Sequence, residues 1–339
     1  MTEQTVRYSF KEIEDVLYKL FLKYEFSEAR AQLLAKVHTE STLMGVSSHG
    51  VNRVSRFINY IEKGIVNVNA NAVKVESFGS IERWDGNFGP GVSNATTCTE
   101  RAIALAKENG MGMVALRNTN HWMRGGTYGW QAANAGCIGI LFTNTQPNMP
   151  PWGGKDSRIG NNPFIVAIPR DEGHVVLDMS LSQYSFGKIN DYKLKGEQLP
   201  FAGGWDAEDV LSHDPEKILA KERGLPIGYW KGSALAIILD MLATLLSAGN
   251  STYRTGLKGY ETGISQIFLC IYPEIFNDKE LQQKLINEII DYTHDVSPMR
   301  KGDSTYYPGE QSSNIKAKNL KEGIPINQDV WEEIVRLSI

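Results

Sequence analysis

The sequence predicts an α/β protein of two closely packed lobes, one helical and one built around a sheet. At 339 residues the chain exceeds the ~250 to 300 residues at which a single hydrophobic core stops growing. Its first 75 residues carry apolar side chains at helical spacing. From residue 76 onward, short strand-like runs alternate with helical runs. We therefore expect a helical lobe over residues 1–75 and a sheet-containing domain over residues 76–277.

The first lobe is expected to hold three helices. Residues 9–23 place an apolar side chain at every third or fourth position, which is the period of an amphipathic helix. A second helix should end at Gly45, a residue suited to the left-handed position after a helix. Ser47 or Ser48 can then cap a third helix that stops at Gly64. Two helices near the C-terminus complete the set, and we expect residues 278–339 to join this lobe.

The sheet domain is read from strand-like runs separated by helices and loops. Residues 163–170 and 174–180 indicate neighbouring strands, because a charged turn ending in glycine separates them. An apolar stretch at 233–248 contains Asp240 and is too short for a membrane span, so it predicts a buried core helix. The remaining expected elements are a helix at 101–110, strands at 111–118, 137–144 and 263–273, a polar loop region at 188–223, and helices at 278–293 and 328–337.

Composition and charge exclude several classes of protein. A net charge of −4, with basic and acidic residues interspersed, gives no electrostatic footprint for a nucleic acid. Three widely spaced cysteines argue against a disulfide framework and against a metal site. The charged N-terminus lacks the apolar core of a secretion signal. We therefore expect a cytoplasmic protein that binds neither nucleic acid nor a membrane.

One apparent dinucleotide motif fails on its context. Residues 110–115 match G-x-G-x-x-A, but that fingerprint requires a strand before the glycines and a helix after them. Here a helix precedes and a strand follows. We interpret Gly110 as the end of a helix, so this motif does not support a Rossmann assignment.

The stretch "SSHGVNR" raises the first hypothesis about chemistry. On the expected helix, His49 and Arg53 share one face, and the apolar side chains occupy the other. The helix N-terminus disfavours a charged imidazole, so His49 should be neutral until an anion binds. Arg53 offers a planar fork for a carboxylate, with His49 beside it as a proton donor. The alternative is a solvated helix face with an incidental histidine.

Three further segments carry candidate residues. His121 follows an expected strand, next to Gly125 and Gly126, which permit close backbone approach. Lys231 stands at the start of the apolar helix, where a cation beside free N–H groups favours an anion. Residues 309–311 are expected in a loop with acceptors for ribose hydroxyls. For each segment the alternative is a structural loop without a ligand.

Taken together, six segments resemble the type 2 malate/L-lactate dehydrogenase family over nearly the whole chain. These segments are residues 47–53, 117–133, 149–169, 175–188, 228–247 and 306–310. The resemblance implies a non-Rossmann α/β (α+β) fold with a largely antiparallel central sheet and a helical lobe. It also implies a homodimer with shared active sites and an NAD(P) cofactor. Because no arginine cluster is present for a 2′-phosphate, we expect NADH rather than NADPH.

The resemblance further implies roles by position. His49 and His121 are the expected catalytic residues, and Arg53 is the expected substrate-binding residue. The residues that match the family's cofactor contacts are His174, Val175, Val176, Leu177, Asp178, Met179, Ser180, Trp230, Lys231, Gly309, Glu310 and Gln311, with His174 expected to contribute through its backbone.

The expected reaction is reduction of the C2 ketone of a sugar-derived 2-oxo acid, 2,3-diketo-L-gulonate, to 3-dehydro-L-gulonate. The alternatives within the family are malate, lactate, sulfolactate, ureidoglycolate and a cyclic imino acid. The alternative outside this class is a non-catalytic protein that binds a sugar acid.

Overall fold

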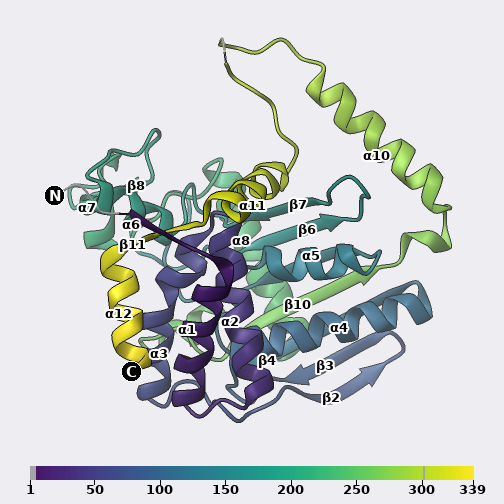
Figure 1. Ribbon diagram of the computed structural model, residues 1–339, viewed down its shortest axis with the longest axis horizontal. Coiled ribbons are helices and arrows are strands. Elements are labelled where there is room, and N and C mark those ends of the chain that lie inside the picture. The colour runs from purple at the N-terminus through teal and green to yellow at the C-terminus, as the bar shows by residue number, and fades with distance from the viewer. Residues whose placement is uncertain (1–4, 301) are drawn as a thin grey trace.

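The computed structural model describes residues 5–300 and 302–339, and its centre is a seven-stranded sheet (Figure 1). The strands lie in the order β2 (Val73–Phe78), β3 (Ile81–Asp85), β4 (Met111–Thr119), β10 (Ile264–Ile271), β5 (Ile138–Thr143), β6 (Phe164–Ile168) and β7 (Val175–Met179). Neighbouring strands are antiparallel except for the parallel pair β3 and β4. The expected largely antiparallel sheet is confirmed, and β6 and β7 are the predicted neighbouring strands.

The central position of β10 decides which loops meet at one edge of the sheet. This strand pairs with β4 on one side and with β5 on the other. Ile264, its first residue, lies opposite Thr119, the last residue of β4. The loop that leaves β4 therefore lies beside the loop that enters β10, although about 140 residues separate them in sequence.

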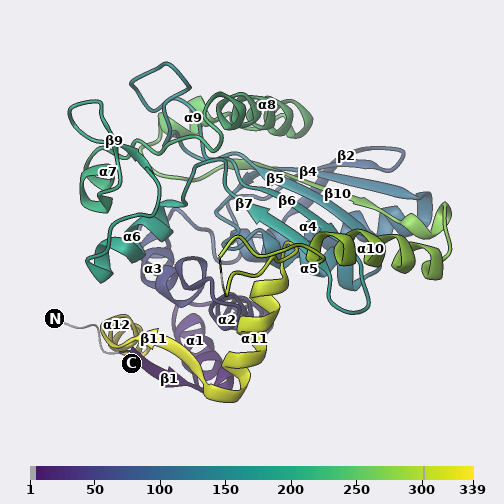
Figure 2. The same cartoon turned by 90° about the horizontal axis from the view of Figure 1, so that it is seen from above.

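Helices cover both faces of the sheet (Figure 2). α4 (Gly91–Asn109) and α5 (Gly126–Asn134) pack on one face, and α8 (Trp230–Ser247), followed by the short α9 (Thr252–Gly256), lies on the other. Gly110 ends α4 with a φ of 84°, and β4 begins at the next residue. The helix-then-strand context of the failed dinucleotide motif is thus confirmed.

The prediction that the apolar helix is buried is wrong for one of its faces. Four side chains of α8 at helical spacing are 40 to 75% exposed: Ile238, Met241, Leu242 and Leu245. The opposite face packs on the sheet through Ala236, Leu239 and Ala243. Among the described helices, α8 is long and apolar enough to cross a membrane. This is weak evidence for a membrane span, because core helices have the same length and composition.

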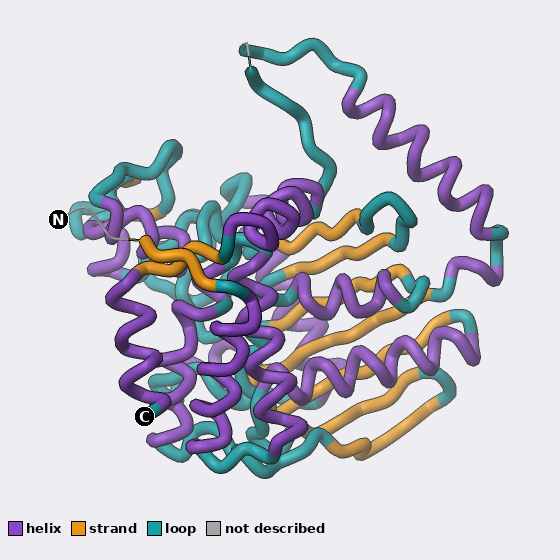
Figure 3. Tube along the Cα trace, viewed as in Figure 1, coloured by secondary structure: helices purple, strands orange, loops and turns teal. Residues whose placement is uncertain are grey.

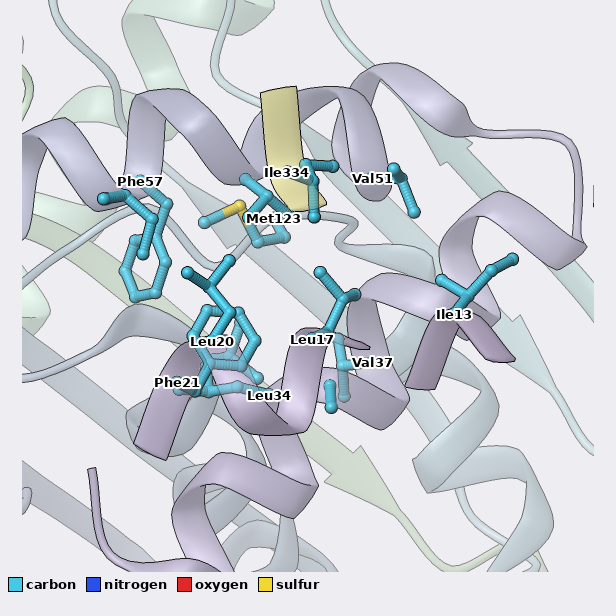
Figure 4. Packing of buried hydrophobic residues seen from close by; sticks show 14 of the residues in the cluster. Ile13, Leu17, Leu20, Phe21, Leu34, Val37, Val51, Phe57, Met123 and Ile334 are labelled. Atoms are coloured by element: carbon cyan, nitrogen blue, oxygen red, sulfur yellow. The ribbon is translucent and has the colours of Figure 1, made fainter. Parts of the chain in front are cut away.

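The helical lobe surrounds a second core (Figure 4). Its elements are β1 (Thr5–Tyr8), α1 (Phe10–Lys23), α2 (Glu28–Leu43), α3 (Val54–Glu62), β11 (Ile324–Asn327) and α12 (Gln328–Ser338). Trp331 and Ile334 of α12 pack into this core, and β11 pairs with β1. In contrast, α10 (Lys279–His294) projects away from the lobe (Figure 3). The lobe borders at 75/76 and 277/278 stay a prediction.

The third helix begins later than predicted. Two 3-10 turns, Ser47–His49 and Val51–Arg53, precede α3, and neither Ser47 nor Ser48 caps a helix. Gly50 separates the turns with φ −115° and ψ −125°, because the chain docks there on α2. A Cβ on Gly50 would lie 2.2 Å from Thr42 Oγ1, and the N–H of Val51 donates to that oxygen at 2.9 Å.

Two other segments expected as loops contain helices. The polar region 188–223 overlaps α6 (Phe186–Lys195) and holds β8 (Gly204–Trp205), β9 (Leu211–Ser212) and α7 (Pro215–Lys221) around a small core. This region has few apolar residues, so its sequence shows no clear helical periodicity. Glu310 and Gln311 do not lie in a loop but begin α11 (Glu310–Glu322), since the Glu310 carboxylate accepts the N–H of Tyr307 at 3.0 Å.

Candidate active site

Two adjoining cavities lie where the helical lobe meets the sheet. The first encloses about 580 Å³ and the second about 340 Å³. The residues that line both cavities are Ser48, His49, Asn161, Pro163, Ser185 and Asp191. His49 is the histidine among these shared residues, so it stands at the junction of the two cavities.

His49 is held by its own turn and by α6. Its Nδ1 lies 3.0 Å from Ser48 Oγ. A Cβ on Gly187 would lie 2.6 Å from Ser48 Cβ, so α6 packs closely against this turn. Burial, followed by the positive charges of Arg53 and Arg124, lowers the pKa of His49 to about 4. The predicted neutral state is confirmed, but burial is its main cause rather than a helix N-terminus.

Arg53 lines the second cavity, as its pairing with His49 predicted. Arg53 is the last residue of the second 3-10 turn, and the charge of Glu261 acts on its guanidinium. Arg56, one turn further along α3, lines the same cavity. The structure therefore presents two guanidinium groups to the second cavity, and such groups favour a carboxylate.

His121 enters the second cavity from the loop after β4. Its ring stacks on His49 with centroids 5.8 Å apart and an interplanar angle of 24°. The N–H of Met123 donates to His121 Nδ1 at 2.9 Å. Burial is the largest cause of a pKa for His121 well below its ordinary value, followed by the charge of Arg53. The two predicted histidines are thus brought face to face.

Glu261 is a site residue that sequence reasoning missed. Only 7% exposed, it precedes β10 and lines the second cavity. Its Oε1 lies 4.0 Å from His121 Nε2, and its Oε2 accepts the N–H of Gln146 at 3.4 Å. The adjacent Thr262 donates to Asn120 at 2.7 Å, which ties the two loops together. The missing signal was the pairing of β10 with β4, which no local pattern reveals.

The predicted cofactor residues divide into two groups. Those that line the first cavity are Val176, Leu177, Asp178, Met179, Ser180 and Gly309. Those outside the lining of both cavities are His174, Val175, Trp230, Lys231, Glu310 and Gln311. The His174 ring instead contacts the N–H of Arg170 and the side chain of Asn134. The first cavity is therefore lined by strand β7 but not by the first residues of α8.

Arg124 is a second residue that the sequence did not identify. Its side chain is 4% exposed, lines the first cavity and stacks on Trp130 at 4.6 Å. Its Nε lies 3.7 Å from Asp178 Oδ2 and has no hydrogen-bond partner in the part of the chain that the structure describes. The next glycines allow the expected close approach, because the N–H of Gly126 donates to the same Asp178 oxygen at 2.8 Å. The signal was the arginine directly before Gly125 and Gly126.

The structure combines a non-Rossmann sheet with two adjoining polar cavities. The malate/L-lactate dehydrogenase profile covers residues 8–335, and the chain belongs to that family. It is 41% identical to the 2,3-diketo-L-gulonate reductase of Haemophilus influenzae over 333 residues, which are 98% of this chain and 100% of that protein.

Solved structures agree with this assignment. Malate dehydrogenase from Entamoeba histolytica superposes with a TM-score of 0.93 at 26% identity, covering 99% of this chain and 98% of that chain. Sulfolactate dehydrogenase from Methanocaldococcus jannaschii superposes with a TM-score of 0.86 at 27% identity, covering 98% and 96%. The chain is therefore an oxidoreductase of a family whose members act on hydroxy and oxo acids.

Proposed function

We propose that this protein reduces the C2 ketone of 2,3-diketo-L-gulonate to 3-dehydro-L-gulonate with a nicotinamide cofactor. Full-length relatives that are 40 to 41% identical and carry the name 2,3-diketo-L-gulonate reductase support this substrate. The structural observation that carries the proposal is the place of His49 at the junction of two cavities. A proton donor there borders both a cofactor cavity and a substrate cavity.

The second cavity is the proposed substrate site. Arg53 binds the carboxylate of the oxo acid through its planar fork, and Arg56 adds positive charge. The cavity volume of about 340 Å³ accommodates a six-carbon acid, and amide side chains such as Asn148 and Gln146 line it. His49 donates the proton that the reduced oxygen requires.

The first cavity is the proposed cofactor site, and its residues fit an anionic dinucleotide. The buried Arg124 Nε has no hydrogen-bond partner among the described residues, so it supplies an N–H donor, and the guanidinium supplies a positive charge next to Asp178. The nicotinamide cofactor supplies the hydride when it is bound. The backbone of Val176 to Ser180 and Gly309 orient it from β7 and from the turn before α11.

NADH is the proposed donor rather than NADPH. The cations of the first cavity are Arg124, which faces Asp178, and Lys188, which lies 5.4 Å from the ring of Tyr192. Neither belongs to an arginine cluster of the kind that accommodates a 2′-phosphate.

A homodimer with shared active sites is the proposed assembly. The exposed apolar face of α8 favours burial against a second copy of this chain. Trp230 and Lys231 begin that helix outside the lining of both cavities, and in the proposed dimer they contact the cofactor of the neighbouring subunit. The proposed compartment is the cytoplasm, and the three buried free cysteines are in keeping with reducing conditions.

The test is oxidation of NADH by purified protein with 2,3-diketo-L-gulonate, pyruvate or oxaloacetate, and NADPH as the alternative donor. Turnover with the diketo acid well above that with the other two acids is the expected result. Turnover with pyruvate or oxaloacetate alone would retain the family and reject the substrate. No turnover with any acid would reject the proposal as stated.

A further inference from the structure

The two stacked histidines differ in what touches their Nδ1 atoms. The N–H of Met123 donates to His121 Nδ1 at 2.9 Å. A backbone N–H can donate but never accept, so this nitrogen must keep its lone pair. The proton of a neutral His121 therefore lies on Nε2. A second proton would set two N–H donors against each other.

Met123 is held firmly in this position. Its side chain is 4% exposed and packs into the core of the helical lobe (Figure 4). Its φ of 64° lies in the left-handed region, which is unfavourable for a residue other than glycine. The surrounding packing fixes this backbone, so its N–H cannot turn away to admit a proton on His121.

His49 has the opposite kind of partner. Its Nδ1 lies 3.0 Å from Ser48 Oγ. A hydroxyl both donates and accepts, so it can bond to Nδ1 whether or not that nitrogen carries a proton. His49 can pass between its neutral and charged forms without losing this hydrogen bond.

We infer that His121 stays neutral throughout the reaction and serves as a fixed Nε2–H donor to oxygen acceptors in the second cavity, while His49 alone carries the transferred proton. This inference rests on the proposed function and gives different roles to the two histidines that the family resemblance names as catalytic. The carboxylate oxygen Glu261 Oε1 lies 4.0 Å from Nε2 and has no hydrogen-bond partner among the described residues.

The charges around His121 agree with a neutral ring. Burial, Arg53, His49, Arg56 and His38 all oppose a second proton on His121. The acidic groups that line the second cavity are Glu261, Glu222 and Asp191. Burial raises the pKa of Glu261, so the acid closest to His121 is itself a poor anion.

The activity test makes the same substitution at both positions. Glutamine carries an N–H donor but no proton to transfer. His49→Gln should lose ~10²-fold or more of kcat. His121→Gln should lower kcat much less than His49→Gln does, and it should leave the midpoint of the pH profile of kcat unchanged. His121→Leu, which has no donor, should fall well below His121→Gln. Equal losses in both glutamine variants, or a shifted pH midpoint in His121→Gln, would overturn the inference.

A second test needs no substrate. Nuclear magnetic resonance of protein labelled with ¹⁵N-histidine, without cofactor or substrate, reports which ring nitrogen carries the proton. His121 is assigned by the signal that disappears in His121→Gln or, should that variant not fold, in His121→Asn. We expect a protonated Nε2 and a bare Nδ1 from pH 5 to 8. A proton on Nδ1 in that range would overturn the inference, even if 2,3-diketo-L-gulonate proved not to be the substrate.

Discussion

At the scale of single residues, burial does more than charge to set the chemistry of this site. His49 has a pKa of about 4 in the absence of ligand, so its ring is neutral at pH 7. A bound carboxylate favours the charged ring and raises this pKa, because it offsets Arg53 and Arg124. Proton donation thus becomes possible only when the substrate is in place.

The first prediction concerns His49→Ala. This variant should lower kcat by ~10² to 10⁴-fold and leave NADH affinity nearly unchanged. In the native enzyme, kcat for reduction should fall as the pH rises from 5 to 8, because the charged ring of the bound state is lost with increasing pH. A rate that stays flat over this range would contradict a histidine donor.

The second prediction concerns Arg53→Lys. A point charge replaces the planar fork, so KM for the oxo acid should rise about tenfold or more while kcat changes less. Steady-state kinetics at saturating NADH measures both constants. The matched control is Arg83→Lys, whose side chain bonds to Glu76 and to the backbone of Leu246 outside both cavities. An unchanged KM in Arg53→Lys would place the carboxylate elsewhere.

At the scale of secondary-structure elements, α6 and the 3-10 turn of His49 act as one unit. Gly187 lets the helix approach so closely that an added Cβ would lie 2.6 Å from Ser48 Cβ. Because Ser48 holds His49 Nδ1, a displacement of α6 moves the proposed proton donor.

The third prediction is therefore that Gly187→Ala lowers kcat/KM by about tenfold or more without unfolding the protein, since small misplacements at an active site are costly. Gly196→Ala is the control at the other end of α6, where nothing lies within 4 Å of an added Cβ. Its own φ of 65° costs some stability, so the comparison is made on kcat/KM of folded protein. Equal activity in both variants would show that the contact with Ser48 does not matter.

The sequence predicted the elements with strong periodicity and failed where tertiary contacts override local pattern. The strands 163–170 and 174–180 and the helix before Gly110 were read correctly from alternation and turn chemistry. The helix at residue 48 was not, because Gly50 docks on Thr42 of another helix. His49, Arg53 and His121 meet at one site as proposed from resemblance, yet Glu261 was missed, since only the β10–β4 pairing brings it there.

At the scale of the whole molecule, the exposed apolar face of α8 bears on assembly, and the buried His38 bears on how stability depends on pH. The exposed apolar face of α8 lies beside Lys231, which begins the same helix. The helical-lobe core encloses His38, which is fully buried and bonds to the carbonyl of Leu34 at 2.7 Å.

The fourth prediction concerns assembly. Leu245→Glu places a charge on the most exposed residue of the α8 face and should convert the proposed dimer to a monomer, as measured by light scattering. The monomer should bind NADH more weakly. Lys231→Ala should weaken NADH binding while leaving the dimer intact. A dimer that survives Leu245→Glu, or NADH binding unchanged in Lys231→Ala, would reject shared sites built from α8.

The fifth prediction concerns acid. Burial lowers the pKa of His38 from 6.5 to about 4, so the unfolded chain takes up a proton that the folded protein refuses. Stability should be full above pH 6.5 and fall between pH 6.5 and 4. The His38 share of the loss from pH 7 to 5 is about 2 kcal/mol.

Urea unfolding of the native protein, His38→Leu and His294→Gln at pH 7 and pH 5 measures this share. The free energy of unfolding of His38→Leu should change less between the two pH values than that of the native protein. His294→Gln is the control because its side chain is partly exposed, at 34%. Equal pH dependence in the native protein and His38→Leu would contradict the assignment.

The position of β10 also bears on how the chain is made. The strand is encoded at residues 264–271 but lies between β4 and β5, which are complete by residue 143. A nascent chain of 260 residues therefore contains the two outer parts of the sheet, β2 to β4 and β5 to β7, without the strand that joins them. Each part then has an unpaired edge strand. The second cavity cannot form until Glu261 and β10 have been synthesised. The nascent chain therefore forms its site only after more than three-quarters of its length has been translated.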